Sequence, residues 1–239
     1  MERKVFVNRL IDVATHYKTV YVMGCFGSPM NADNKKRYTS NHAYNTSKDR
    51  TNRINSCSPD TFGFDCVCLI KGILWGWNGD TTKTYGGSVY TSNGVPDIGA
   101  DQLIKKCLNV STDFSGIVQG ALVHMAGHVG VYIGDGLVVE CSPKWKDGVQ
   151  VTAVSNLGGV SGYNSRTWER WGTLPYIDYG TDDEAPDLSG RTENTEGPDE
   201  WASEAWAAAV NAGITDGTRP RDTITRQEVV TLLHRLNLF

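Results

Sequence analysis

Two short segments carry residue types that can perform nucleophilic catalysis. Residues 63–71 read Gly-Phe-Asp-Cys-Val-Cys-Leu-Ile-Lys, and about sixty residues later 127–136 read Gly-His-Val-Gly-Val-Tyr-Ile-Gly-Asp-Gly. A cysteine attacks a carbonyl carbon as its thiolate, so it needs a base or a positive potential that favours loss of its proton. The first segment offers a cysteine and the second a histidine. Their order and local contexts predict a thiol hydrolase.

Cys66 is expected in the first turn of a buried helix. Apolar side chains recur at helical spacing from Cys66 to Trp77, and Gly76 and Asn78-Gly79 are helix-ending signals. The free N–H groups of a first turn favour negative charge, so we expect them to lower the pKa of the thiol and to stabilise an oxyanion. Cys68 lies about 200° further around such a helix and cannot share this position.

The remaining cysteines are interpreted as small buried side chains and mostly free thiols, because their spacing is irregular and the chain is too large to need disulfide staples. They are Cys25, Cys57, Cys68, Cys107 and Cys141. The chain has no Cys-x-x-Cys pair, so the sequence predicts no zinc site. We expect no metal and no cofactor.

His128 is the candidate base, because among the five histidines it lies in a glycine-flanked strand where small neighbours leave room for a substrate. His124 is the second candidate. A base of this kind works best when a third group fixes its orientation. Glu140, in the next predicted strand, is the candidate for that role.

The hairpin register decides whether Glu140 can reach His128, since side chains alternate between faces. A three-residue loop, Gly134-Asp135-Gly136, pairs Gly130 with Glu140 and places Glu140 on the face of His128. A two-residue Asp135-Gly136 turn places it on the opposite face. We predict the three-residue loop; the alternative for Glu140 is a solvent-facing carboxylate.

Helical and strand patterns succeed each other along the chain. An amphipathic helix is expected over 2–17, with Val5, Leu10, Ile11 and Ala14 on its apolar face, and a shorter one over 98–108. Residues 28–59 are polar and locally basic, and are interpreted as a long insertion, either a surface loop or a lid with a basic rim for an anionic polymer. Short β-rich runs follow in an antiparallel meander, at 121–125, 128–133, 137–141, 149–154 and 168–177. The predicted fold class is α+β.

The C-terminal part differs in composition. Residues 178–198 form an acidic segment poor in apolar residues and are predicted to be a flexible linker. Residues 199–239 are predicted to be a helical pair: one helix starts near Trp201 and closes at Gly213, and a capping box over 225–228 opens the second. The predicted domains are therefore 1–177, the linker, and 199–239.

Composition excludes several partners. The net charge of −4 and the pI near 5.7 give no basic surface for nucleic acid. No apolar run approaches the ~20 residues that span a bilayer. The first residues, Met1-Glu2-Arg3-Lys4, do not lead into a secretory signal, so we expect a protein made in the cytoplasm without an export signal.

Over residues 5–177 the chain resembles the NlpC family of papain-like bacterial cell-wall peptidases, which are related to the CHAP amidases. Asp65-Cys66, the segment from His128 to Gly136, and a polar residue one strand later correspond to the family's cysteine, histidine and third residue. The resemblance implies a papain-like fold and cleavage of peptidoglycan. It also implies that the hydroxyl of Tyr21, in Tyr-Val-Met-Gly, helps to form the oxyanion hole; the alternative for Tyr21 is a packed core aromatic.

Two departures from the family pattern bear on the substrate. Val67-Cys68 stands where the family commonly has Ser-Gly, so a hydroxyl that would contact the peptide is missing. The interval from Tyr21 to Cys66 is also longer, because of the segment 28–59. Both leave the thiol chemistry in place and leave the scissile bond open.

Residues 199–238 resemble one S-layer-homology repeat, through Trp-Ala-Ser-Glu-Ala from Trp201, Asn-Ala-Gly-Ile-Thr-Asp-Gly-Thr-Arg-Pro from Asn211, and Ile-Thr-Arg-Gln-Glu from Ile224. Such modules bind cell-wall polymers, usually as several copies. With one copy here, binding of a secondary wall polymer and self-association through 199–239 are competing expectations.

Together these features predict a bacteriolytic hydrolase of phage-endolysin type, a cysteine peptidase that acts on the cell wall after release. The bond that it cleaves would be the D-glutamyl to diamino-acid linkage, or alternatively the N-acetylmuramoyl-L-alanine amide. A non-catalytic wall-binding or assembly protein and an acyl transferase are the other hypotheses. The sequence does not determine the host, the cross-bridge or the oligomeric state.

Overall fold

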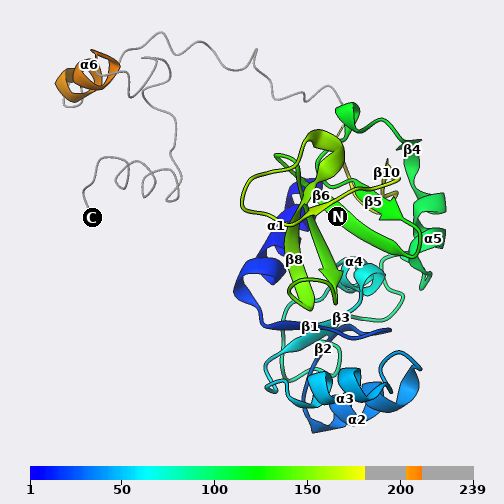
Figure 1. Cartoon of the computed structure of the whole chain (residues 1–239). Helices are drawn as coiled ribbons and strands as arrows, with labels where there is room; N and C mark the ends of the chain where they lie inside the picture. Colours follow the sequence, from blue (N-terminus) through cyan, green and yellow to red (C-terminus); the bar gives the residue numbers. More distant parts are fainter. Residues whose placement is uncertain (181–202, 212–239) are drawn as a thin grey trace. The chain divides into compact units, whose positions relative to one another are not determined.

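The computed structural model describes residues 1–180 and 203–211. The chain divides into two compact units, Met1–Gly180 and Thr181–Phe239. In the described part of the first unit, helices and two β-sheets pack into an α+β fold (Figure 1). Of the second unit, only α6 (Ser203–Asn211) is described. It falls within the first predicted tail helix, whereas most of the predicted linker and the second tail helix lie outside the described residues.

A seven-stranded sheet carries the histidine half of the predicted site. Its strands follow the order β4 (Leu108–Ser111), β10 (Arg170–Thr173), β5 (Leu122–Met125), β6 (His128–Gly134), β7 (Leu137–Ser142), β8 (Gly148–Val154) and β9 (Ser165–Arg166). Strands β5 to β8 are consecutive and antiparallel, which confirms four strands of the predicted meander. The fifth predicted strand, at 168–177, is β10, and it pairs with β5 at the other side of the meander and not with β8. The edge strand β4 and the short parallel strand β9 were not predicted.

Helix α4 (Cys66–Leu74) carries the cysteine half and packs against β6 and β7. The carboxylate of Asp65 caps it by accepting the N–H of Cys68 at 2.7 Å, and Gly76, with φ of +92°, follows its end. The sequence predicts one buried stripe, but every residue of α4 is buried, including Lys71. The helix is enclosed because α1 (Arg3–His16) also packs on it.

The opening helix α1 confirms the predicted helix, with one difference in its buried face. Val5 was expected to be buried and is 41% exposed, whereas Phe6 and Val7 are buried. The buried stripe is thus rotated slightly from the predicted one.

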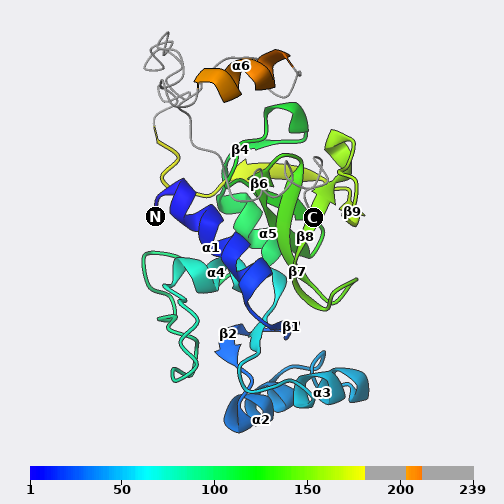
Figure 2. The ribbon, with the colours of Figure 1, turned by 90° about the vertical axis from the view of Figure 1, so that its left-hand side faces the viewer.

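The segment 28–59 is folded, and its interpretation as a surface loop is wrong. It contains the end of β2 (Phe26–Pro29), then α2 (Ala32–Asn41) and α3 (Lys48–Asn55). Strand β2 pairs with β3 (Phe62–Phe64), which also pairs with β1 (Thr19–Tyr21). The two helices lie side by side beneath this small sheet in both ribbon views (Figures 1 and 2).

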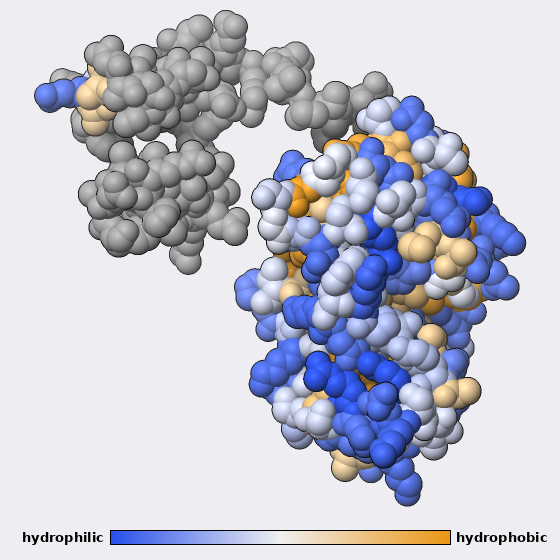
Figure 3. All heavy atoms as spheres, in the orientation of Figure 1, coloured by the Kyte–Doolittle hydropathy of each residue, from blue (hydrophilic) through white to orange (hydrophobic). Residues whose placement is uncertain are grey.

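A small core explains why this polar segment folds. Its members are buried side chains from the small sheet and both helices: Val20, Val22, Cys25, Met30, Tyr38 and Ile54. The few apolar residues of the segment therefore point inward, and hydrophilic residues cover the surface over α2 and α3 at the lower end of Figure 3. The predicted shorter helix near residue 100 is present as α5 (Ala100–Leu103), continued by the 3₁₀ turn Ile104–Lys106.

The described residues also form single 3₁₀ turns at Phe114–Gly116 and Ser155–Leu157. Across residues 1–180 and 203–211, no helix has the length and apolarity needed to cross a membrane. All six cysteines are free thiols.

Candidate active site

Cys66 is the first residue of α4, as predicted, and its side chain faces strand β6. Its Sγ lies 3.9 Å from the carbonyl oxygen of Gly127, and the backbone N–H of Val129 also interacts with the sulfur. The thiol is thus in contact with the residues on both sides of His128. The structure brings the predicted nucleophile to the strand segment that carries the predicted base.

The ionisation of Cys66 differs from the expectation. Burial, together with the negative charge of Asp65, raises the pKa of the thiol to about 12, although N–H groups of Val129, Val67 and Cys66 itself lower it in part. The helix start and the nearby imidazole were expected to lower this pKa, but burial and the capping carboxylate of Asp65 outweigh the positive potential of the first turn. At neutral pH the sulfur is therefore protonated, and a base must take its proton during attack.

His128 is held by Glu140. The Nε2 atom of His128 lies 2.6 Å from Oε2 of Glu140, so the carboxylate accepts the Nε2–H and the Nδ1 atom is left with the lone pair that a base needs. The ring of Trp168 stacks on the imidazole, with ring centroids 5.6 Å apart and planes within 9°. The histidine is therefore fixed in both tautomer and orientation.

Glu140 is fully buried and has further partners. Thr152 Oγ1 donates to it at 2.7 Å, and Arg166 donates from Nε at 2.9 Å and from Nη2 at 2.8 Å. Burial alone would raise the pKa of Glu140, but the hydrogen bonds from His128 and Arg166 outweigh it, so the pKa is lowered. Glu140 is thus an ionised carboxylate inside the fold, and the alternative of a solvent-facing residue is wrong.

The register that puts Glu140 beside His128 arises differently from the prediction. The turn has two residues, Asp135 and Gly136, both with positive φ, and the predicted three-residue loop is wrong. The register shifts between Tyr132 and Gly134, so Ile133 is an extra residue in β6. This bulge restores the pairing of Gly130 with Glu140 that the longer loop would have given.

Tyr21 ends β1 and is buried, and it lines the same pocket as Cys66. Its hydroxyl lies 4.0 Å from the sulfur of Met23. Burial and the neighbouring Cys66 raise the pKa of this hydroxyl, so it remains a protonated donor. Both the oxyanion-hole role and the packed-aromatic role are compatible with this position.

A pocket of about 460 Å³ opens beside Cys66. Its wall is formed by three groups of residues: Tyr21, Met23, Gly24 and Phe26; His42, Asp65, Cys66, Val67, Cys68 and Lys71; and Tyr90, Asp97, Ile98, Gly99, Ala100 and Gly127. Lys71 is almost fully buried and forms an ion pair with Asp97, which also accepts the hydroxyl of Tyr90 at 2.7 Å. The wall of the pocket beside Cys66 therefore combines apolar side chains with polar ones, among them one ion pair.

The competing nucleophiles are less well placed. Burial raises the pKa of Cys25, Cys57, Cys68, Cys107 and Cys141, and none of these thiols lies beside a histidine partner in the described hydrogen bonds. All but Cys57 are buried. The four buried thiols are packed side chains, as the sequence indicated, whereas Cys57 is partly exposed and its interpretation as a buried side chain is wrong.

His124, the second candidate base, has a different partner. Its Nε2 lies 2.8 Å from Oδ1 of Asp101, which also accepts the N–H of Gly127 at 2.8 Å. His124 and His128 are four residues apart but are bound to different carboxylates. In residues 1–180 and 203–211, no three His, Cys, Asp or Glu side chains form a metal-binding group.

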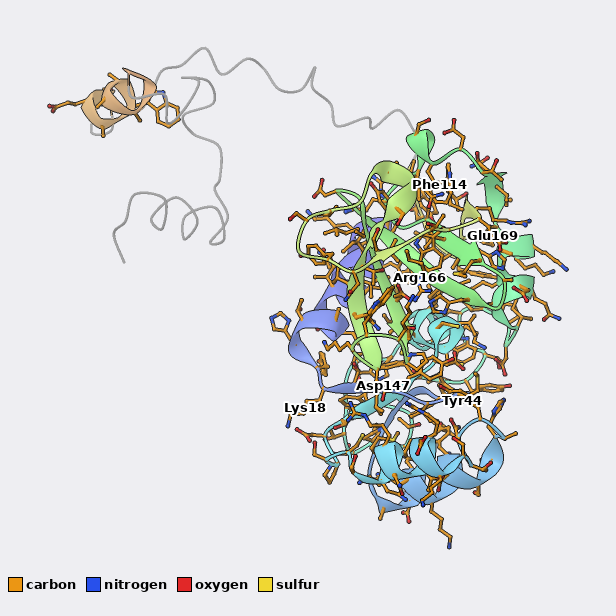
Figure 4. All side chains as sticks on the ribbon, in the orientation of Figure 1. Lys18, Tyr44, Phe114, Asp147, Arg166 and Glu169 are labelled. Atoms are coloured by element: carbon orange, nitrogen blue, oxygen red, sulfur yellow. The ribbon has the colours of Figure 1, made fainter. Side chains whose placement is uncertain are left out.

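Sequence reasoning missed Thr152, Arg166 and Trp168. A buried glutamate requires a cation, which could have prompted a search for an arginine. Arg166 lies on β9, whose two residues carry no strand pattern, and only its pairing with β8 brings it to Glu140 (Figure 4). Thr152 is a polar residue in a buried strand, which is only a weak indication in the sequence that it belongs to the site.

The site thus combines a thiol at a helix start with a histidine oriented by a carboxylate. No protein-family profile matches the chain. No curated protein matches it. Among solved structures it is similar to the peptidoglycan hydrolase RipB of Mycobacterium tuberculosis, at 16% sequence identity and a TM-score of 0.36. The match covers 71% of this chain and 65% of that one, so the chain spans just under two thirds of the length of RipB.

Proposed function

We propose that the chain is a peptidoglycan hydrolase with a papain-like catalytic unit in which Cys66 is the nucleophile, His128 the base and then acid, and Glu140 the orienting residue. One observation carries the proposal: the Cys66 thiol lies against the backbone on both sides of His128, whose Nε2–H is bound by the buried Glu140. This arrangement leaves Nδ1 of His128 as the atom that can accept the thiol proton.

The reaction follows from these positions. Nδ1 of His128 takes the thiol proton as Sγ attacks the carbonyl carbon of an amide, and the oxygen becomes an oxyanion held by backbone N–H groups of the α4 start and by the Tyr21 hydroxyl. Collapse of the intermediate breaks the C–N bond, and His128 returns the proton to the leaving amine. Water, deprotonated by His128, then attacks the thioester and releases a carboxylic acid and the thiol.

The proposed substrate is the stem peptide, on the sequence resemblance described above. The bond is the D-glutamyl to diamino-acid linkage, with the N-acetylmuramoyl-L-alanine amide as the alternative. Val67 lines the pocket next to Cys66, so the family hydroxyl is replaced by an apolar contact at this point. Mass spectrometry of fragments from digested walls distinguishes the two bonds, because they leave different new amino termini.

The C-terminal segment 199–239 is proposed to be an S-layer-homology-like module that holds the enzyme on a wall polymer or pairs it with a second copy. The whole protein would then act as a phage-type endolysin, made in the cytoplasm and reaching the wall after release.

The test is clearing of a suspension of purified walls. Intact protein should clear it, and Cys66→Ala and Cys66→Ser should lower the rate by about 10⁴-fold or more, because the attacking group is lost. Cys68→Ala is the matched control, since it removes a neighbouring buried thiol, and it should keep most of the activity. Clearing that survives Cys66→Ala would refute the thiol mechanism.

A second candidate is a wall-binding or assembly protein with an inactive catalytic unit. The high pKa of Cys66 favours it, because a protonated thiol is a poor nucleophile. Co-sedimentation with walls but no clearing, and no new amino termini, would support this function instead.

A further inference from the structure

The pocket wall formed by Tyr21, Met23 and Gly24 is a turn with little regular structure of its own. Strand β1 ends at Tyr21, and Gly24 has φ of +78°. The N–H of Gly24 donates to Oδ2 of Asp65 at 2.7 Å, so this turn is joined to the cap of the helix that carries Cys66. A shift of the turn would therefore alter the pocket beside the thiol.

Asn45, which follows α2, holds the middle of this turn. Its Oδ1 accepts the N–H of Met23 at 3.0 Å, and its Nδ2 donates to the Met23 carbonyl at 2.9 Å. The side chain of Asn45 is fully buried. Both backbone groups of Met23 are thus satisfied by one amide from the segment that the sequence marked as an insertion.

Arg50, on α3, holds the start of the same turn. Its Nη2 donates to the Tyr21 carbonyl, and its guanidinium lies 5.9 Å from the centroid of the Tyr21 ring and 5.6 Å from that of Tyr44. Tyr44 in turn meets Tyr21 edge to face at 5.7 Å. Arg50 therefore contacts both the backbone and the ring of Tyr21.

The charge of Arg50 is balanced by the carboxylate of Asp147. Its Nη1 lies 2.8 Å from Oδ1 of Asp147, in the connection between β7 and β8, and Arg53 binds the second oxygen of the same carboxylate at 2.9 Å. Figure 4 places Asp147 and Tyr44 at the level where the small sheet and its helices meet the larger sheet. Arg50 is mostly buried, whereas Arg53 is half exposed and does not contact Tyr21 in the described hydrogen bonds and ring contacts.

We propose that Asn45 and Arg50 are positioning residues that fix the Tyr21 to Gly24 wall of the pocket. Supplying these two residues is the role of the segment that contains α2 and α3. The catalytic consequence rests on the proposed function. The Tyr21 hydroxyl has the Met23 sulfur as its hydrogen-bond contact, at 4.0 Å, so the position of the hydroxyl is set through its backbone and ring. A displacement of about 1 Å in such a site can cost about 10²-fold in rate.

The first experiment needs no catalysis. The chain has four methionines, so ¹³C-methyl methionine spectra are simple; Met23 lines the pocket, and Met30 lies in the core under α2 and α3. In full-length Arg50→Gln the Met23 signal should shift or broaden while Met30 is unchanged. Arg53→Gln, the matched control that loses the same ion-pair partner, should leave both signals in place.

Two results would overturn the inference here: an unchanged Met23 signal in Arg50→Gln, or an equal Met23 shift in both variants. If Met30 also shifts, the segment has been disrupted as a whole. Arg50→Lys then decides, because it keeps the charge toward Asp147 but cannot make the same paired contacts with Tyr21 and Asp147. A Met23 signal at the wild-type position in Arg50→Lys would also contradict the proposal.

The second experiment tests whether the contacts of Arg50 with Tyr21 affect the rate of catalysis. On a soluble stem-peptide substrate, Arg50→Gln should lower kcat about 10- to 100-fold with a smaller change in KM. In a Tyr21→Phe background the same substitution should have little further effect, because Arg50 acts through Tyr21. An equal loss of kcat in the wild-type and Tyr21→Phe backgrounds would show that Arg50 does not act through Tyr21. An inactive wild type would reject the proposed function and leave the spectroscopic test valid.

Discussion

Glu140 is the residue on which the proposed chemistry of the site depends. It has no exposed surface, yet it remains ionised because Thr152, Arg166 and His128 fill its hydrogen-bonding capacity. A carboxylate buried without such partners would take up a proton instead. The same bonds leave His128 with a free Nδ1. The charge balance of one residue thus determines which atom of its neighbour can act as the base.

Glu140 should also link stability to pH. Its folded pKa lies below the ordinary value of 4.5, so its stabilising contribution is present above that pH and is lost as the pH falls through the lower folded value. Glu140→Gln should cost about 3 kcal/mol at pH 7, since it leaves Arg166 buried without its counter-charge.

Urea unfolding at pH 7 and at pH 3 measures this effect. The gap in unfolding free energy between wild type and Glu140→Gln should be clearly smaller at pH 3. A gap that is the same at both values would show that Glu140 does not change ionisation on folding.

Cys66 should react as a thiol that depends on His128. Because its own pKa is about 12, the thiolate fraction at pH 7 is very small unless His128 takes the proton. Iodoacetamide labelling of Cys66 at pH 7 should therefore slow at least about 10-fold in His128→Ala, and the rate should rise with pH toward 12. Peptide mass spectrometry separates Cys66 from the more exposed Cys57, which serves as the internal control. Equal Cys66 rates in the two proteins at pH 7 would contradict a role for His128 as base.

At the scale of elements, the β6–β7 hairpin decides the site through one extra residue. The Asp135-Gly136 turn alone would pair Glu140 with Val131 and turn its side chain away from His128. The bulge at Ile133 reverses that parity. With Ile133 present in the strand, the tight turn therefore gives the pairing of Gly130 with Glu140 only because Ile133 bulges out.

Deletion of Ile133 tests this account. Ile133 is the unpaired residue, so its deletion leaves a regular two-residue hairpin in which Gly134 still pairs with Leu137 and Gly130 with Glu140. The deletion variant should therefore keep Glu140 beside His128, retain most of its hydrolysis of walls, and keep its helical and strand signals in circular dichroism. Ile133→Ala keeps the backbone residue and should retain most of the activity. A folded but inactive deletion variant, beside an active Ile133→Ala, would show that pairing of Gly130 with Glu140 is not enough to set the position of Glu140.

At the scale of the whole molecule, the proposed catalytic residues lie in one compact unit. All the residues assigned to the site belong to Met1–Gly180, and the core that supports them comes from α1, α4 and the two sheets. Because every residue assigned to the site lies in the first unit, that unit is expected to fold and act without the second.

A protein of residues 1–180 should thus melt within about 2 °C of the corresponding transition of the full chain, and it should hydrolyse a soluble stem peptide at a similar rate. Its co-sedimentation with purified walls should fall, since the proposed wall-binding module is absent. Unchanged sedimentation would place wall binding in the first unit, and loss of folding would show that the second unit stabilises it.

The sequence by itself determined local features: the start of the helix at Cys66, four strands of the meander, and the α+β class. The pairing of Gly130 with Glu140 depended on the bulge at Ile133, which the sequence did not predict. These follow from periodicity, capping and strand parity, which act over a few residues. Tertiary structure alone decided the rest. It brought Arg166 and Thr152 to Glu140, folded residues 28–59 into a support for Tyr21, and raised the pKa of Cys66 through burial beside Asp65. Burial and charge pairing depend on residues far apart in the chain, so no local pattern encodes them.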